Sequence, residues 1–209
     1  MKVIGEWTNP IDPNTSMDLV KESVKRKNGT CEYCGFKMPI TEVNPLAGLN
    51  VCLAHGGMTP EISNTVTLCA FCVKLNSLEN IHNNGSPIGI FIEMPWLKQS
   101  DLINILRIIY CAQSSNLPEI KNTVSYIAST HLSQILLRIP AEWNRYHFDG
   151  TANSLIKALQ KNKGYSDKKI SDQSYYERLR LYISREQFEH AITLWQPIVE
   201  AQLLVREEA

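Results

Sequence analysis

Two Cys-x-x-Cys pairs constrain the possible folds of this 209-residue chain more than any other feature. Cys31 and Cys34 form the first pair, and Cys69 and Cys72 form the second. Gly35, directly after the first pair, fits the turn of a zinc knuckle, because the chain must turn there with little side-chain hindrance. A two-residue spacer lets both sulfurs of a tight turn face one ion, and a tetrahedral Zn²⁺ takes four such ligands. The sequence therefore predicts a structural Zn²⁺ on Cys31, Cys34, Cys69 and Cys72. The alternative is two buried or disulfide-bonded pairs.

The start of the chain and its remaining cysteines bear on the choice between metal and disulfide. The first residues, Met-Lys-Val-Ile-Gly-Glu-Trp, lack the apolar run of a secretory signal, and the apolar stretches are too short or too interrupted to span a bilayer. We therefore expect a cytoplasmic protein without membrane insertion, where paired cysteines favour a metal. Cys52 and Cys111 are expected to be buried as small hydrophobes, with a ligand role for Cys52 as the alternative.

The charge balance of the chain indicates which class of partner the protein is expected to bind. Lys plus Arg number 21 and Asp plus Glu number 21, so the formal net charge is zero. A dedicated nucleic-acid binder usually carries a basic excess, because phosphate contacts supply most of its affinity. The aromatic segment 143–148 has the ring faces on which bases stack, but packing between lobes or against a protein is favoured. We expect a protein partner rather than nucleic acid.

The residues around the cysteines predict a small mixed module. An irregular lead-in over residues 1–14 precedes a helix that Thr15 or Ser16 caps and that ends near Arg26. A short strand at 49–53 and a second one running into Cys69 form a hairpin, and a helix begins at Ala70. A knuckle, a hairpin and a second knuckle at a helix start are the order of a treble-clef zinc site.

The rest of the chain is predicted to be mainly helical. Residues 80–87 are strongly turn-forming and mark the boundary between a zinc-binding module, residues 1–84, and a lobe, residues 85–209, packed on it. After a strand at 88–94, the apolar spacing predicts helices from Ser100, from Pro118 to Arg138, at 151–161 and over 174–206. The broad apolar face of the first of these helices includes Ile105 and Ile108. His131 falls on an apolar helix face and is expected to be a core residue. The predicted fold class is α+β.

The first third of the chain resembles the zinc-framed HNH endonuclease family. The matching residues are Cys31-x-x-Cys34-Gly35, the strand-turn with His55, and Asn64-Thr-Val-Thr-Leu-Cys69-x-x-Cys72. In that family a strand supplies a His that activates water, an Asn fixes the hairpin, and a final His binds a catalytic metal.

The catalytic positions of that family are not matched here. The strand reads Val51-Cys52-Leu53 where a His is expected, and the residue after the last cysteine is Val73. We therefore expect a retained zinc scaffold without catalytic residues. The alternative is a metal-dependent nuclease or DNA-binding protein in which His55 is a displaced base, with Asn64 and Glu61 or His82 as its remaining polar groups.

The whole chain resembles the DotN, or IcmJ, family of the Dot/Icm type IVB secretion system, on its length, its degenerate zinc module and its helical remainder. That resemblance implies a non-enzymatic adaptor with a structural zinc. It also implies that the protein binds the C-terminal tail of the coupling ATPase DotL, within the complex that recruits effectors, peripherally at the inner membrane. The helices would then provide a groove for an extended or helical segment of the partner.

Overall fold

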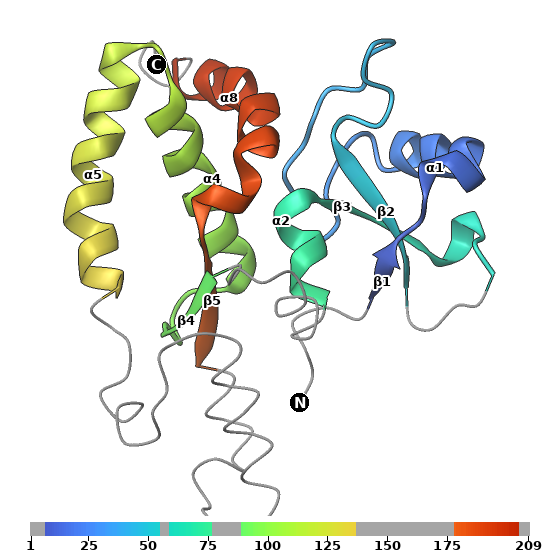
Figure 1. The fold of residues 1–209 in the computed structure, drawn as a ribbon, viewed down its shortest axis with the longest axis horizontal. Coiled ribbons are helices and arrows are strands. Elements are labelled where there is room, and N and C mark those ends of the chain that lie inside the picture. The colour runs from blue at the N-terminus through green and yellow to red at the C-terminus, as the bar shows by residue number, and fades with distance from the viewer. Residues whose placement is uncertain (1–6, 55–58, 77–88, 137–177, 205–209) are drawn as a thin grey trace, which may run out of the picture.

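The computed structural model describes residues 7–54, 59–76, 89–136 and 178–204 (Figure 1). Several sequence predictions lie outside these residues: His55, His82, the turn-forming segment 80–87, the aromatic segment 143–148 and the helix at 151–161. The backbone of His131 lies in a helix, but its side chain is also outside the description.

The described elements are short strands, α-helices and 3₁₀ turns. The strands are β1 (Trp7–Pro10), β2 (Leu49–Ala54), β3 (Thr65–Cys69), β4 (Gly89–Glu93) and β5 (Leu179–Ile183). The α-helices are α1 (Pro13–Arg26), α2 (Ala70–Val73), α4 (Gln99–Ser114), α5 (Pro118–Leu136) and α8 (Glu189–Leu204). Three 3₁₀ turns complete the list: η1 (Ile62–Asn64), η2 (Lys74–Asn76) and η5 (Arg185–Phe188).

The N-terminal part is a three-stranded antiparallel sheet in the order β1-β2-β3, covered by α1 (Figure 1). The β2–β3 hairpin pairs Leu49 with Cys69 at one end and Leu53 with Thr65 at the other. On α1, the buried hydroxyl of Ser23 lies 3.0 Å from that of Thr65, so the helix contacts the hairpin through a polar pair as well as through apolar side chains. The predicted hairpin, followed by a helix that starts after Cys69, is confirmed.

The predicted irregular lead-in is wrong over residues 7–10 and from residue 13 on, while residues 1–6 lie outside the description. Residues 7–10 form β1 against β2, and α1 begins at Pro13, where the side chain of Asp12 accepts a hydrogen bond from the Asn14 N–H at 2.9 Å. Asp followed by Pro is a standard helix start, because proline needs no N–H donor in the first turn. Ser16, one of the two residues predicted to cap the helix, instead has non-helical backbone angles and marks a kink.

The described residues of the C-terminal part form a two-stranded sheet and three helices. Strands β4 and β5 pair antiparallel from Gly89–Ile183 to Glu93–Leu179 although they lie far apart in the sequence. A Cβ at Gly89 would stand 1.9 Å from the Tyr182 carbonyl oxygen, so this close approach requires glycine. The prediction that residues 174–206 are helical is wrong over β5, whose residues 179, 181 and 183 are buried alternately, with the two-residue period of a strand.

One buried core joins the two parts. Phe71, which lies between the cysteines of the second pair, packs against Phe188 and against Trp195 of α8. Tyr110 of α4 donates its hydroxyl to the carbonyl of Ile183 in β5. The fold is α+β, as predicted, with a four-cysteine module of the type that binds zinc. The division of the chain at residue 84 stays a prediction, because that residue lies outside the described ranges.

Candidate metal centre

The four cysteines predicted from the sequence meet at one point. Among the described residues they are the one group of ligand side chains close enough to share a metal, and their sulfur atoms all lie within 4.8 Å of one another. All four side chains are buried, and none is in a disulfide. The Sγ atoms of Cys34 and Cys69 are 3.8 Å apart. A tetrahedron with Zn–S bonds of about 2.3 Å has edges of about 3.8 Å, so the donor set fits Zn²⁺.

A tight turn presents the first two sulfurs. Thr30 and Lys37 pair as an isolated antiparallel bridge, the Cys31 N–H donates to the Phe36 carbonyl at 2.9 Å, and the Gly35 N–H donates to the Cys31 carbonyl at 2.9 Å. Gly35 has a φ of +73°, in the left-handed region that side chains disfavour. The sequence interpretation of this glycine as part of a knuckle is confirmed.

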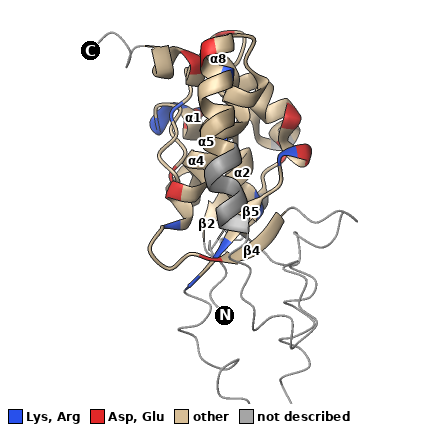
Figure 2. Cartoon of the chain, turned by 90° about the vertical axis from the view of Figure 1, so that its left-hand side faces the viewer, with Lys and Arg blue, Asp and Glu red and all other residues tan. Residues whose placement is uncertain are grey.

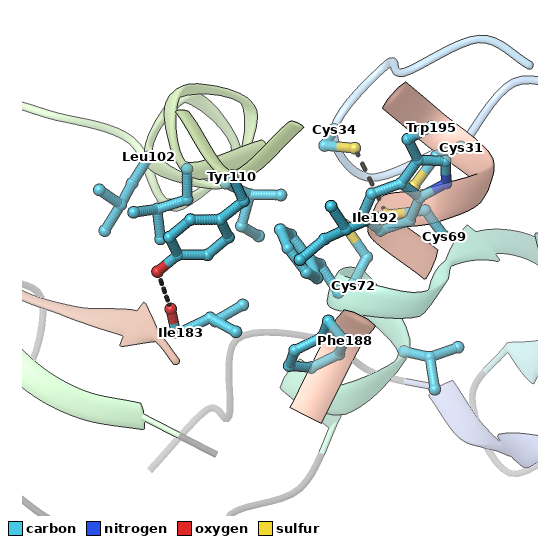
Figure 3. Packing of buried hydrophobic residues seen from close by; sticks show 14 of the residues in the cluster. Cys31, Cys34, Cys69, Cys72, Leu102, Tyr110, Ile183, Phe188, Ile192 and Trp195 are labelled. Atoms are coloured by element: carbon cyan, nitrogen blue, oxygen red, sulfur yellow. Dashed lines mark hydrogen bonds between the residues drawn. The ribbon is translucent and has the colours of Figure 1, made fainter. Parts of the chain in front are cut away.

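A strand-to-helix junction presents the other two sulfurs. Cys69 ends β3 in extended conformation and is the residue that caps α2, and Cys72 follows within the first turn of that helix. Residues three apart on a helix start lie on one side of it, so both sulfurs point toward the first knuckle. Figure 3 shows the sulfur atoms of all four cysteines gathered beside Trp195.

Backbone pairing fixes the distance between the two knuckles. The Glu32 N–H donates to the Thr67 carbonyl at 2.9 Å, and the Glu32 carboxylate accepts from the Thr67 N–H at 2.8 Å. Lys27 forms an ion pair with Glu32 at 2.6 Å. The first knuckle is therefore attached to β3 only two residues before Cys69, which aligns the two cysteine pairs.

Arg107 of α4 completes the surroundings of the sulfurs, and the sequence analysis missed it. Its side chain is 1% exposed, and its Nη2 donates to the Sγ of Cys69 at 3.1 Å and to the Sγ of Cys34 at 3.3 Å. Asn104, one turn earlier on α4, accepts from the Arg107 Nη1 and donates to the Cys34 carbonyl at 2.9 Å. The signal in the sequence was a single arginine inside the apolar pattern of this helix.

The buried face of α4 therefore differs from the predicted one. Ile105 and Ile108, which the apolar pattern assigned to the core, are each 40% exposed, while Arg107 lies inside. Its guanidinium carbon stands 4.0 Å from the centroid of the Phe36 ring, 4.8 Å from that of Trp195 and 5.8 Å from that of Phe71. Three ring faces thus surround a cation that contacts two sulfurs.

The cysteine pKa values differ strongly within the cluster. Burial raises the pKa of Cys69 and of Cys72 well above the ordinary value. Hydrogen bonds from the other three cysteines lower the pKa of Cys34, and the charge of Arg107 acts in the same direction. The contact with Cys34 raises the pKa of Cys31, but hydrogen bonds from Cys69 and Cys72 outweigh it and lower that pKa to about 7. Four thiolates this close together repel one another, so a cation bound between them is needed to keep all four sulfurs deprotonated.

The remaining cysteines lie apart from this centre. Cys52 is buried in β2 and Cys111 is buried in α4, and burial raises the pKa of each thiol to about 12. Both are thus protonated, unreactive core residues in the structure. This agrees with the interpretation of both as small hydrophobes.

Of the nuclease-like candidates, Asn64 has a structural role in the hairpin. Its side chain donates to the Thr59 carbonyl at 2.8 Å and accepts from the Glu61 N–H at 3.1 Å, which fixes the loop before β3. Val73, where the resembling family has a metal-binding His, is 7% exposed. Within the described residues, no carboxylate or imidazole joins the four cysteines in the metal-ligand group.

A groove on the surface lies between α4, α8 and the loop after the first knuckle. Its volume is about 920 Å³, and its walls are mostly apolar. The lining residues are Pro39, Ile108, Pro197, Ile198, Val199, Ala201, Gln202 and Leu203. Ile108, one of the two isoleucines that were predicted to be buried, therefore lines this groove.

No family model matches the chain. The chain is similar to one curated protein, the type 4 apparatus protein DotN of Legionella pneumophila, with 24% identity over 174 residues. The matched region covers 82% of this chain and 74% of that protein. The chain is similar to DotN. The similarity to DotN extends across most of both proteins, so it reaches beyond the cysteine module into the helical part.

Two further properties concern the surface. Among the described helices, none has both the length and the apolar character required to cross a bilayer. Helices α4, α5 and α8 carry two charged side chains each, and Arg107 is the buried one among them. Figure 2 shows acidic and basic residues interspersed on this side of the molecule, with most of the helical ribbon carrying neither.

Proposed function

We propose that this protein is a non-enzymatic, zinc-stabilised adaptor subunit of a type IV secretion apparatus. The similarity to DotN over most of both chains carries this proposal. A role in the apparatus implies protein partners, and the neutral charge of the chain supports protein over nucleic acid as the partner.

The metal in this proposal is a structural Zn²⁺ on Cys31, Cys34, Cys69 and Cys72. When bound, Zn²⁺ supplies a cross-link between two knuckles and a charge that holds four thiolates together. A site with four protein ligands leaves no open coordination position for substrate or water, which supports a structural rather than a catalytic role. The burial of all four sulfurs supports the same role.

The partner in this proposal is the C-terminal tail of a coupling ATPase of the DotL type. Binding to that tail would hold the protein in the cytoplasm at the periphery of the inner membrane and close to effector recruitment. The groove between α4 and α8 offers apolar walls for a helical or extended segment. The low charge of the surrounding helices supports an apolar contact as the main source of affinity.

The test measures tail binding by calorimetry with purified protein and a peptide of the ATPase C-terminal tail. Ile108→Asp places a charge in the groove, and Ile127→Asp is its matched control, because Ile127 is 46% exposed on α5 and does not line the groove. We expect at least roughly tenfold weaker binding for Ile108→Asp, since a buried unpaired charge costs several kcal/mol, and unchanged binding for Ile127→Asp. Wild-type protein that does not bind the tail would contradict the proposed partner.

The nuclease alternative is tested on the same preparation. We expect no nicking of plasmid DNA by the zinc-loaded protein in Mg²⁺ or Mn²⁺. Nicking that disappears in His55→Ala would overturn the non-enzymatic proposal and restore a hydrolytic role for that histidine.

A further inference from the structure

The strongest unexplained feature of the molecule is a buried arginine without a buried acid. Arg107 is 1% exposed, and among the described residues its polar partners are Asn104 and the sulfurs of Cys34 and Cys69. No carboxylate among the described residues pairs with it, and its Nε has no hydrogen-bond partner there. A guanidinium stays charged in proteins, so burying it without a negative partner is very costly.

The sulfurs can supply that negative partner when they are thiolates. Four neutral thiols would leave the charge of Arg107 uncompensated, whereas four thiolates around Zn²⁺ carry a net charge of about −2 by simple addition. One guanidinium beside such a cluster offsets half of that charge. The arginine and the metal-thiolate cluster therefore stabilise each other, and each is costly to bury alone.

The geometry makes Arg107 a bridge between the two knuckles. Its Nη2 reaches one sulfur of each Cys-x-x-Cys pair, Cys34 of the first and Cys69 of the second. The same helix donates an amide hydrogen from Asn104 to the Cys34 carbonyl. Ring contacts from Phe36, Phe71 and Trp195 cover the guanidinium, so water has little access to these hydrogen bonds.

We propose that Arg107 is a positioning residue of the metal centre: its guanidinium donates to one thiolate of each knuckle, offsets the charge of the metal-thiolate cluster and fastens α4 to the metal. This inference rests on the proposed function, specifically on the structural Zn²⁺ bound by the four cysteines. It adds that the helical part contributes to metal retention and that metal binding stabilises the attachment of α4, which carries Ile108 at the proposed docking groove.

The test compares Arg107→Met and Arg107→Lys with wild type in two measurements. The first is the rate at which a colorimetric chelator removes zinc, and the second is the sulfur-to-metal charge-transfer band of the protein reconstituted with Co²⁺. Loss of partners that contact metal ligands typically lowers metal affinity roughly 10- to 100-fold, and we expect the chelator to remove zinc from Arg107→Met faster by about that factor. We expect the band to move to lower energy, because hydrogen bonds to a thiolate lower the energy of its donor electrons.

Arg107→Lys keeps the charge but lacks the planar guanidinium, whose Nη2 contacts both sulfurs while its Nη1 donates to Asn104. We expect an intermediate zinc release rate and an intermediate band shift. This variant also keeps the inference testable if Arg107→Met does not yield folded protein.

Leu106→Ala is the matched control, since Leu106 is the neighbouring residue on α4, is fully buried and has no side-chain donor for a sulfur. It lowers global stability by creating a cavity, so it shows how far stability loss alone speeds zinc release. We expect its cobalt band to stay at the wild-type energy.

The outcomes separate this inference from the proposed function. Wild-type protein that holds no zinc and binds no Co²⁺ would overturn the proposed structural Zn²⁺ site, and this inference with it. Wild-type protein with one zinc, and Arg107 variants with the wild-type band and with zinc release no faster than in Leu106→Ala, would overturn the inference alone.

Discussion

The ring of Phe71 meets the ring of Trp195 edge to face, with centroids 4.8 Å apart and ring planes at 90°. Phe71 lies between the two cysteines of the second pair, and Trp195 lies on α8. The contact therefore joins the cysteine module directly to the last helix. Phe36, which follows the first pair, also packs its ring edgewise on Trp195 at 5.9 Å, so one indole contacts both knuckles.

Replacement of Trp195 by alanine should destabilise the whole protein. The side chain is fully buried, and truncation of such a residue costs about 3–5 kcal/mol from lost transfer free energy and the remaining cavity. Urea unfolding followed by circular dichroism measures the change. Val43→Ala is the control, because Val43 is 97% exposed and its truncation should change the unfolding free energy by less than about 0.5 kcal/mol. Equal losses in both variants would contradict the described packing.

Substitution of the grouped cysteines should remove the metal, and substitution of the other two should not. We expect Cys34→Ser and Cys69→Ser to lower zinc content per chain and soluble yield, because each removes one of four ligands. Cys52→Ser and Cys111→Ser are matched controls, since they make the same change at equally buried thiols outside the cluster. Elemental analysis of protein purified without added metal gives the zinc content. Full zinc content after replacement of all four grouped cysteines would rule the site out.

The sequence predicted the cysteine cluster because local rules determine it. Spacing alone identifies two knuckles, the turn at Gly35 follows from a glycine that tolerates positive φ, and the strand into Cys69 follows from its residue types. Each of these features depends on a few neighbouring residues, so no knowledge of distant partners was needed.

The features that sequence reasoning missed all depend on distant partners. Strand β5 looked helical because its pairing partner β4 lies on the far side of α4 and α5 in the sequence. The side chain of Gln99 donates to the Leu181 carbonyl at 2.9 Å and accepts from the Leu181 N–H at 2.7 Å, which adds a strand-like contact that no local pattern shows. The sequence analysis did not single out Arg107, because its sulfur partners are 38 and 73 positions away.

Two glycines of the first knuckle separate backbone strain from steric clash. Both have positive φ, +65° at Gly29 and +73° at Gly35, but an added Cβ would stand 2.1 Å from the Met38 carbonyl oxygen at Gly29 and would meet nothing within 4 Å at Gly35. We expect Gly35→Ala to cost about 1–2 kcal/mol from the left-handed conformation alone. Gly29→Ala should cost more than about 3 kcal/mol, because the clash is with backbone that is itself paired to Gly29.

Thermal unfolding of the zinc-loaded proteins, combined with zinc content, measures this difference. Gly35→Ala is expected to keep its zinc, while Gly29→Ala is expected to lose soluble protein or zinc. Equal stability of the two variants would mean that the chain near Met38 moves to accommodate the added methyl group.

Zinc binding should release protons and weaken as the pH falls. Burial raises the pKa of Cys69 and Cys72 well above the ordinary value, so both thiols carry protons at neutral pH without metal. Zinc takes thiolates, so those two protons leave on binding, and the apparent affinity falls about hundredfold for each pH unit of acidification. Below about pH 7, where Cys31 also takes up a proton, the dependence should become steeper.

Competition titrations against a chromophoric chelator across this pH range measure the slope, and proton release into weakly buffered solution measures the stoichiometry. Cys52→Ser is the control, because burial raises the pKa of Cys52 to about 12 and its thiol stays protonated in both states. An affinity independent of pH would mean that the thiolates form before the metal arrives, contrary to the effect of burial on Cys69 and Cys72.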